Sequence, residues 1–370
     1  MQIEVYKMTA NETEVAIEME AICDTFSSLL WDIECYQCGV FEIYIAASPK
    51  NIAIFRTGRI VGRNDDNQHF GIIESVQIST DTENGDYLTV SGRFLICLLE
   101  RRIIYPTYSV TAETAYSDIV RSVVSQNAIS DDNRRIPGLS LGQVNGACWE
   151  QTATLQISYA NLMEWLYTIC KKISGTANIR LVKESGEQYK MVLDLSEGTD
   201  RSVLQEENPH IVFSDGYSNL LSFNYAEDTS VQLNFAYVLG HGEGAERKRT
   251  TYFDGDEPSY LERYEVYVDA DDISEEQQID GGTVPIPEEE YIALLKTRGS
   301  EKLVQPKTAS ESTIATNATQ YQYQKDYAVG DYVTVQHIRF GMIQPRIQLV
   351  GMIESFDQNG RSFTPTFKED

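Results

Sequence analysis

A five-residue segment that recurs near both ends of the chain most constrains the fold. Gly71–Ser75 reads Gly-Ile-Ile-Glu-Ser, and Gly351–Ser355 reads Gly-Met-Ile-Glu-Ser. Each copy lies in an apolar, strand-like stretch and precedes an Asn-Gly pair, at Asn84-Gly85 and Asn359-Gly360, and then more strand-like sequence. A match this short arises by chance in a long chain, so its weight comes from the shared context. The pattern predicts two related β-modules, one near each end.

The composition fits a globular, strand-rich protein with an acidic surface. Hydrophobic residues make up 42% of the 370 residues, and 22 tyrosines favour strands. The balance of 30 basic against 56 acidic residues, a net charge of −26, excludes a typical nucleic-acid-binding protein. The acidity serves either solubility or a surface that repels a polyanion. The sequence has neither an apolar run of about 18 residues, which a membrane span needs, nor a secretory signal, so we expect synthesis in a cytosol.

The cysteines are scattered, as expected for reduced thiols packed in cores. Cys35 and Cys38 form one CxxC pair, which is typical of a redox motif or half of a zinc site. Neither a second CxxC nor a cluster of histidines accompanies it, so structural thiols are favoured. The six residues are Cys23, Cys35, Cys38, Cys97, Cys148 and Cys170.

The first segment, residues 1–106, is predicted to consist of short strands that end in a helical turn. The Asn84-Gly85 pair predicts a hairpin, because glycine supplies the positive φ of a tight turn. Phe94 and Leu98 share a face at helical spacing, and Arg101 and Arg102 follow where cations suit the helix dipole. Predicted strands are Phe41–Ala46, Ile52–Phe55, Gly71–Ser79 and Tyr87–Val90.

The next segment, residues 107–208, is predicted to be a small α+β domain. Thr111 is the expected N-cap of a helix whose apolar stripe runs to Val124. A second amphipathic helix is expected over Asn161–Ile173. A hairpin should join Ile179–Lys183 to Tyr189–Leu193.

The remaining residues predict a second strand-rich module that is split by an insertion. The module comprises residues 209–240 and 320–370, and the inserted segment is 241–319. The insertion carries one expected helix, with Pro287 in its first turn and Pro306 beyond its end. Predicted strands are Ile211–Phe213, Leu221–Tyr225, Val231–Leu239, Asp331–Gln336, Ile347–Phe356 and Phe363–Phe367.

The motifs that carry chemistry are weak. The four histidines form neither an HExxH nor an HxH pair, and no nucleophile elbow or P-loop occurs. Gly240–Gly244 resembles an anion-binding loop, but basic residues follow it, which favours a plain connection. The clusters Asp254–Glu257 and Asp269–Asp272 could bind Ca²⁺ but lack the twelve-residue pattern, so solvated loops are favoured. No catalytic, cofactor-binding or metal-binding residue is assigned, and we expect no enzyme activity.

Several stretches together resemble one known family. Gly71–Ser75, Tyr87–Arg93 and Leu98–Arg102 are similar to the tail-hub proteins of long-tailed phages and prophages, the siphovirus tail-tip hub family. In that family a comparable strand and leucine-rich turn close the first β-barrel. The resemblance continues in the same order at Phe213–Leu220, Leu233–Glu243, Glu290–Leu303, Tyr327–Val335 and Phe363–Phe367.

The resemblance implies a β-rich α+β fold with two tube-type β-barrels and small α+β domains between them. It implies a homotrimer whose six barrels form a pseudo-sixfold ring against a hexameric distal tail or tail-tube protein. The tape-measure protein and receptor-binding or tip proteins would be further partners, and genomic DNA would pass the lumen without specific binding. The protein would then reside in the virion, at the tail tip. It implies no catalytic residues.

Three alternatives remain open at this point. The same hub role could serve a contractile phage-tail-like bacteriocin or injection system. A tail-associated cell-wall hydrolase would clear peptidoglycan, and one carboxylate change would abolish that activity. A carbohydrate-binding adhesin would use the many tyrosines as stacking platforms for glycans.

Overall fold

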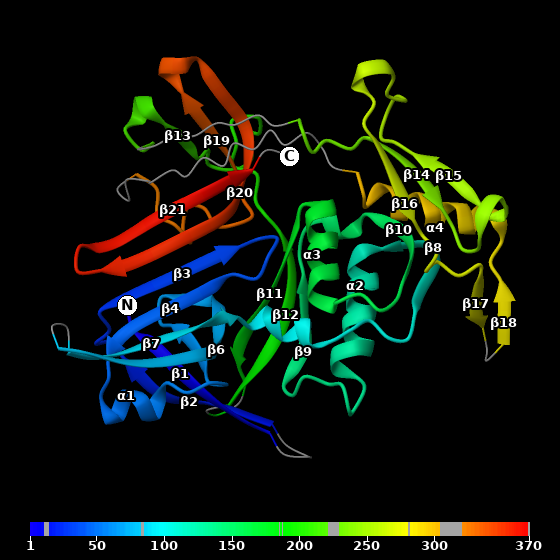
Figure 1. Ribbon diagram of the computed structural model, residues 1–370. Helices are drawn as coiled ribbons and strands as arrows, with labels where there is room; N and C mark the ends of the chain where they lie inside the picture. Colours follow the sequence, from blue (N-terminus) through cyan, green and yellow to red (C-terminus); the bar gives the residue numbers. More distant parts are fainter. Residues whose placement is uncertain are drawn as a thin grey trace.

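A long sheet that joins both ends of the chain dominates the fold (Figure 1). The computed structural model describes residues 1–10, 15–82, 85–184, 186, 188–220, 229–279, 282–303 and 320–368. Fourteen of the described strands form this sheet, in the order β11-β12-β2-β1-β5-β6-β7-β4-β3-β20-β19-β13, with β21 on β20 and β9 on β12. The β-rich α+β class predicted from the sequence is confirmed. Within the described ranges the strand pairings trace an open path, so they do not close a barrel.

The first β-module is built by alternation of buried and exposed side chains. On β3, for example, Leu29, Trp31 and Ile33 are buried, while the residues between them are not. The predicted strand at Ile52–Phe55 is wrong: Ser48 caps a short helix there by accepting the Asn51 N–H at 3.1 Å. The elements are β1 (Ile3–Ala10), β2 (Val15–Cys23), β3 (Ser28–Glu34), β4 (Val40–Ala46), α1 (Pro49–Ile54), β5 (Ile60–Arg63), β6 (Asp66–Asp81) and β7 (Gly85–Phe94).

The middle unit packs its helices against the far end of the same sheet. The helix predicted over Asn161–Ile173 is confirmed as α3, and Asn161 is its cap, with its side chain accepting the N–H groups of Met163 and Glu164. The predicted cap at Thr111 is wrong, because that residue lies in β8, which pairs with β10. The elements are the 3₁₀ turn η1 (Leu95–Arg101), β8 (Tyr108–Ala115), α2 (Tyr116–Val124), the π-turn η2 (Ser125–Ile129), β9 (Leu139–Val144), η3 (Ala147–Glu150), β10 (Thr152–Ile157), α3 (Leu162–Ile173), β11 (Gly175–Lys183) and β12 (Gln188–Glu197).

The second β-module lies beside the first, on the other side of β3. Its elements are β13 (Val212–Ser214), the turn η4 (Asp215–Tyr217), β19 (Tyr332–His337), the turn η7 (Ile338–Phe340), β20 (Met342–Asp357) and β21 (Gly360–Lys368). The three predicted C-terminal strands are therefore confirmed. The predicted strand at Leu221–Tyr225 lies outside the described residues.

The inserted unit sits against the middle unit, far from the first module (Figure 1). Ser274 N donates to Gln156 Oε1 at 2.6 Å, and Lys172 Nζ donates to Ser300 Oγ at 2.7 Å. The predicted helix is confirmed, whereas the strands in the charged segment before it were not predicted. The elements are β14 (Phe235–Leu239), η5 (Gly244–Glu246), β15 (Arg249–Tyr252), η6 (Tyr260–Glu262), β16 (Glu265–Asp269), β17 (Glu276–Ile279), β18 (Gly282–Pro285) and α4 (Glu288–Ser300).

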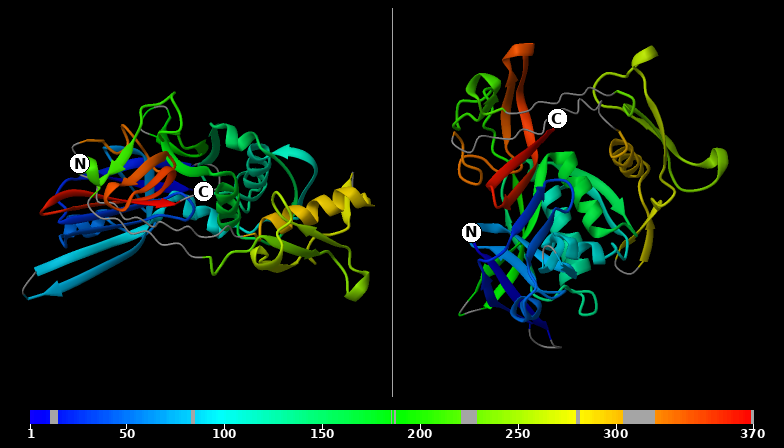
Figure 2. Two further views of the ribbon diagram at one scale, coloured as in Figure 1. Left: turned by 90° about the horizontal axis from the view of Figure 1, so that it is seen from above. Right: turned by 60° about the vertical axis from the view of Figure 1, so that its left-hand side comes forward.

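The two β-modules share one hairpin geometry, with landmarks at a constant spacing. Ile73 N donates to Arg59 O at 2.8 Å, and Leu349 N donates to Asp331 O at 2.8 Å. A β-bulge follows Ile73 on β6 and follows Leu349 on β20. Both strands are 16 residues long, and they start 276 residues apart. The long β6–β7 hairpin projects from the body of the molecule (Figure 2, left).

The repeated pentapeptide lies in corresponding strands but four residues out of register. Gly351 is 280 residues after Gly71, whereas the structural counterpart of Gly71, at the 276-residue spacing, is Ile347. The two glycines also serve different contacts. A side chain at Gly71 would strike the Phe41 ring, and one at Gly351 would approach the Glu34 carboxylate. A hairpin with the same landmarks therefore occurs in both regions, while the residue match that suggested a repeat is not aligned with it.

Candidate functional site

The junction between the two β-modules is an antiparallel strand pair that lies within one chain. Residues Leu29–Glu34 of β3 pair with Gly351–Phe356 of β20, in the register Leu29↔Phe356 to Glu34↔Gly351. Cys35 N donates to Val350 O at 2.8 Å. The sheet of the first module therefore continues into the second without a break.

A buried charge network crosses this junction. Arg63 and Glu354 are each 2% exposed, and Arg63 Nη2 lies 3.0 Å from Glu354 Oε2. Arg361 contacts the same oxygen, and its Nη1 lies 3.1 Å from Asp65 Oδ2. Burial alone would lower the pKa of Arg63, but the Glu354 carboxylate raises it above its ordinary value. The network keeps the guanidinium charged and holds the modules in one register.

Asp66 anchors the turn that carries this network. It accepts the Trp31 Nε1–H at 3.2 Å and lies 2.9 Å from His69 Nδ1. Its other oxygen accepts the Gln68 N–H at 2.9 Å. Burial alone would raise the pKa of Asp66, but His69 and the Gln68 amide hold it well below its ordinary value. The carboxylate is therefore a charged structural anchor.

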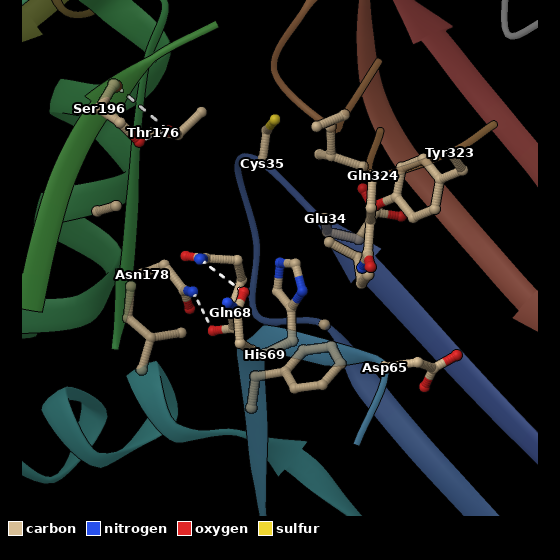
Figure 3. Close-up of a pocket in the computed structure, with 18 of the residues that line it drawn as sticks. Glu34, Cys35, Asp65, Gln68, His69, Thr176, Asn178, Ser196, Tyr323 and Gln324 are labelled. Carbon is tan, nitrogen blue, oxygen red and sulfur yellow. Dashed lines mark hydrogen bonds between the residues drawn. The ribbon is translucent and has the colours of Figure 1, made fainter. Parts of the chain in front are cut away.

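A cavity of about 680 Å³ lies where the two modules and the middle unit meet. His69 stands within it, between Asn178 on one side and Tyr323 and Gln324 on the other (Figure 3). Asn178 Nδ2 donates to Gln68 O at 2.6 Å, so this wall ties β11 to β6. The lining mixes amide, hydroxyl and charged groups drawn from three parts of the chain.

The chemistry available in this cavity is poor for catalysis. The hydroxyls of Thr176 and Ser196 bond to each other at 2.8 Å. Burial raises the pKa of the Cys35 thiol well above its ordinary value, which keeps it protonated and inert. His69 is paired with Asp66, but the described lining places no activated nucleophile beside it. The cavity is therefore a polar interface between the two β-modules and the middle unit.

The candidate residues named from the sequence do not lie together in one site. The thiols of Cys35 and Cys38 bond to separate carbonyls, those of Leu349 and Phe94. The described residues contain no group of three His, Cys, Asp or Glu that could hold a metal ion. Arg102, which follows the η1 turn, donates to the carbonyls of Arg134 and Arg135 in the middle unit.

The glycine loop and the acidic clusters are used internally. The Gly242 N–H donates to Asp271 Oδ1 at 3.0 Å, and the His241 N–H donates to the Tyr291 hydroxyl at 2.9 Å. Asp272 pairs with Arg298 at 2.8 Å. The glycine loop therefore forms internal hydrogen bonds, as expected for a plain connection, whereas Asp272 is paired with a cation and not simply solvated as expected.

The residues that organise the junction were missed in the sequence. Arg63 and Asp66 look like an ordinary polar turn, since their partners come from distant strands. Glu354 gave a usable signal, because a lone carboxylate within the apolar stretch of β20 implies a buried cation. Its counterpart in the repeated pentapeptide, Glu74, is exposed and pairs with Arg93 at 2.8 Å instead.

One known protein family matches almost the whole chain. Residues 13–367 match the family described as Siphovirus ReqiPepy6 Gp37-like protein. The chain belongs to this family. The relationship to siphovirus proteins that the sequence predicted is therefore confirmed. A comparison with curated proteins gives no match.

Three solved tail proteins share the fold over nearly their whole length. A tail protein from Neisseria meningitidis MC58 is 14% identical with a TM-score of 0.56, covering 100% of this chain and 96% of that one. The 43 kDa tail protein of prophage MuSo2 from Shewanella oneidensis is 10% identical with a TM-score of 0.54, covering 99% and 98%. The prophage tail protein gp18 from Listeria monocytogenes EGD-e is 10% identical with a TM-score of 0.53, covering 99% and 94%. At these identities the likeness concerns the fold.

None of the helices in the described ranges has the length and apolar character needed to cross a membrane.

Proposed function

We propose that the protein is a structural component of a phage or prophage tail, where it forms a trimeric hub between the hexameric tube or distal tail ring and the tail tip. The observation that carries this proposal is the pair of β-modules whose hairpins share one geometry 276 residues apart. Three such chains present six similar modules, which removes a mismatch between threefold and sixfold partners.

The proposed domains follow from the two β-modules. Residues 1–106 would form the first tube-type barrel, and residues 209–240 with 320–370 the second, except that β14 (Phe235–Leu239) pairs with β15 and β16 and so belongs with the inserted domain. Residues 107–208 and 241–319 would be the α+β domain and the inserted domain. Because the described strands leave the sheet open, we propose that the barrels are completed in the assembled ring.

The remaining partners are proposed from the hub role. The distal tail or tube protein would dock on the ring, with the tape-measure protein at its lumen and receptor-binding or tip proteins below. The net charge of −26 suits a lumen through which DNA passes without binding. A scaffolding role rather than a catalytic one is supported by the internally paired polar groups of the central cavity. The protein would be made in the bacterial cytoplasm and reside in the virion.

The mass of the purified chain tests this proposal. Native mass spectrometry of the chain, alone and mixed with the distal tail protein of the same phage, should give a species of about 125 kDa, three times the 41.8 kDa chain. The complex with the partner should contain three copies of this chain and six of the partner. A monomer under both conditions would contradict the hub. Clearing of purified peptidoglycan by the chain would instead support the hydrolase alternative.

A further inference from the structure

The outer edge of β6 is the counterpart of an edge that is already covered in the second module. On β20, the residues after the bulge, Gly351–Phe356, pair with β3. At the 276-residue spacing the corresponding residues on β6 are Ser75–Thr80. In the described part of the chain these residues pair with β7 on one side, and the described β5 ladder ends before them, at Ile73.

Equivalent side chains differ sharply in burial between the two modules. Met352 and Glu354 are 0% and 2% exposed beside the β3 junction. Their counterparts on β6 are Val76, which is half-buried, and Ile78, which is 55% exposed. The more exposed position therefore carries the apolar side chain, which is the reverse of what a permanently solvated strand needs.

The composition of this edge also indicates that it is not permanently exposed to solvent. Ser75–Thr80 reads Ser-Val-Gln-Ile-Ser-Thr, without a charged residue or a proline, in a chain with 86 charged residues. Strands that stay at the edge of a sheet usually carry lysines, prolines or bulges that prevent pairing with another chain. This segment carries neither a lysine nor a proline, and the bulge of β6 lies at its start, between Ile73 and Ser75. A six-residue strand of about 20 Å is long enough to pair.

We propose that the Ser75–Thr80 edge of β6 receives an antiparallel strand from the second β-module of another copy of this chain. This inference rests on the proposed hub, and it names the residues that join its subunits. The junction within the chain, β3 on β20, supplies the geometry, because a second module placed against β6 as the first lies against β20 repeats the same contact. Such a head-to-tail contact builds a closed ring when the rotation between copies closes.

The backbone groups involved can be assigned from the covered counterpart. Val350 O accepts from Cys35 N, so alternate residues from Val350 onward direct their backbone groups to β3. On β6 the corresponding groups belong to Glu74, Val76, Ile78 and Thr80. Their amide hydrogens should exchange freely in the single chain and become protected in the assembly.

Hydrogen exchange on the full-length chain is the direct test. Peptides covering residues 74–81 should slow by about tenfold or more in the trimer relative to the diluted monomer, as expected when a solvated amide enters a ladder. Peptides covering 85–91 are the control, since β7 is already paired on both sides with β6 and β4. A trimer in which residues 74–81 exchange as fast as in the monomer would overturn the proposed edge.

A matched pair of substitutions provides the second test. Ile78→Lys places a charge on the proposed edge, and Ile343→Lys places one on β20 at a side chain of similar exposure, 54% against 55%. Ile78→Lys should weaken trimer formation about tenfold or more, whereas Ile343→Lys should leave it unchanged. If the Ile78 variant does not fold, hydrogen exchange alone decides. A wild-type trimer that tolerates Ile78→Lys contradicts the edge but spares the hub, whereas a wild-type chain that never trimerises contradicts both.

Discussion

At the scale of single residues, the ion pair between Arg63 and Glu354 joins segments almost three hundred positions apart. Both side chains are 2% exposed, so neither charge is compensated by water. Removing one partner of such a pair is costly, because the other charge is left buried. These side chains fix how the second module sits on the first.

Glu354→Gln should therefore lower the free energy of unfolding by about 3 kcal/mol, the usual range for breaking a buried pair. Glu289→Gln, at an exposed position on α4, is the matched control and should change stability by less than about 0.5 kcal/mol. Urea denaturation measures both. Equal midpoints for the two variants would show that the network contributes no net stability.

The pKa of Asp66 predicts a dependence of stability on pH. Its pKa is depressed in the folded protein, so the charged carboxylate stabilises the fold above the ordinary value of 3.8, and that stabilisation is lost as the pH falls below it. Asp66→Asn removes the titration. The stability difference between wild type and this variant should have its full size at pH 5 and shrink between pH 4 and pH 3. A difference that stays constant to pH 3 would contradict a depressed pKa.

At the scale of elements, the local signals that were missed are side chains that bond to the backbone at the start of a helix. The helix α3 was predicted from its apolar face, but Asn161 was not named as its cap, although an Asn before an apolar helix accepts the free N–H groups of the first turn. Ile52–Phe55 was misassigned because a four-residue apolar run fits a strand or a helix equally, and Ser48-Pro49 was the signal that should have decided. The prediction of Thr111 as a cap was wrong because its segment pairs with β10, forty residues later in the chain, and therefore forms a strand.

Asn161→Ala should destabilise the protein by about 1 kcal/mol more than Asn161→Asp. Both substitutions remove the hydrogen bond from Asn161 Nδ2 to Glu100 O, but only aspartate keeps an oxygen for the N–H groups of Met163 and Glu164. Aspartate also directs a second oxygen at Glu100 O, so the difference between the variants is a lower limit for the contribution of the cap. Thermal unfolding measures it, and an aspartate variant no more stable than the alanine variant would contradict the prediction.

At the scale of the whole molecule, two strand-rich regions near the two ends of the chain were predictable, and the register between their hairpins was not. Gly85 and Gly360, which each follow an Asn in the sequence, both take a positive φ where the second strand of the hairpin begins. The pentapeptide match shares no structural position, because strand packing constrains burial more than residue identity. The central cavity could not be predicted, because it arises only when three parts of the chain meet. For the charge network, Glu354 indicated a buried cation but not that its partner is Arg63.

The intrachain junction predicts that one chain carries both modules in a fixed arrangement before it assembles. Leu30 on β3 lies directly opposite Ser355 on β20. Opposite residues of an antiparallel pair are about 4.5–5.5 Å apart at Cα, within the range that a disulfide spans. A chain with Leu30→Cys and Ser355→Cys should therefore form this disulfide on oxidation, in dilute solution and within one polypeptide.

The oxidised chain should still assemble like the wild type, because the locked contact is one that every copy already holds. Non-reducing electrophoresis and peptide mapping identify the bond, and the two single-cysteine variants control for reaction with the native thiols. A bond formed mainly between chains would mean that β3 pairs with β20 of another copy, so the junction itself would be the contact between subunits. A locked monomer that cannot assemble would mean that the modules must separate first. Either result would require a different path for the sheet around the ring.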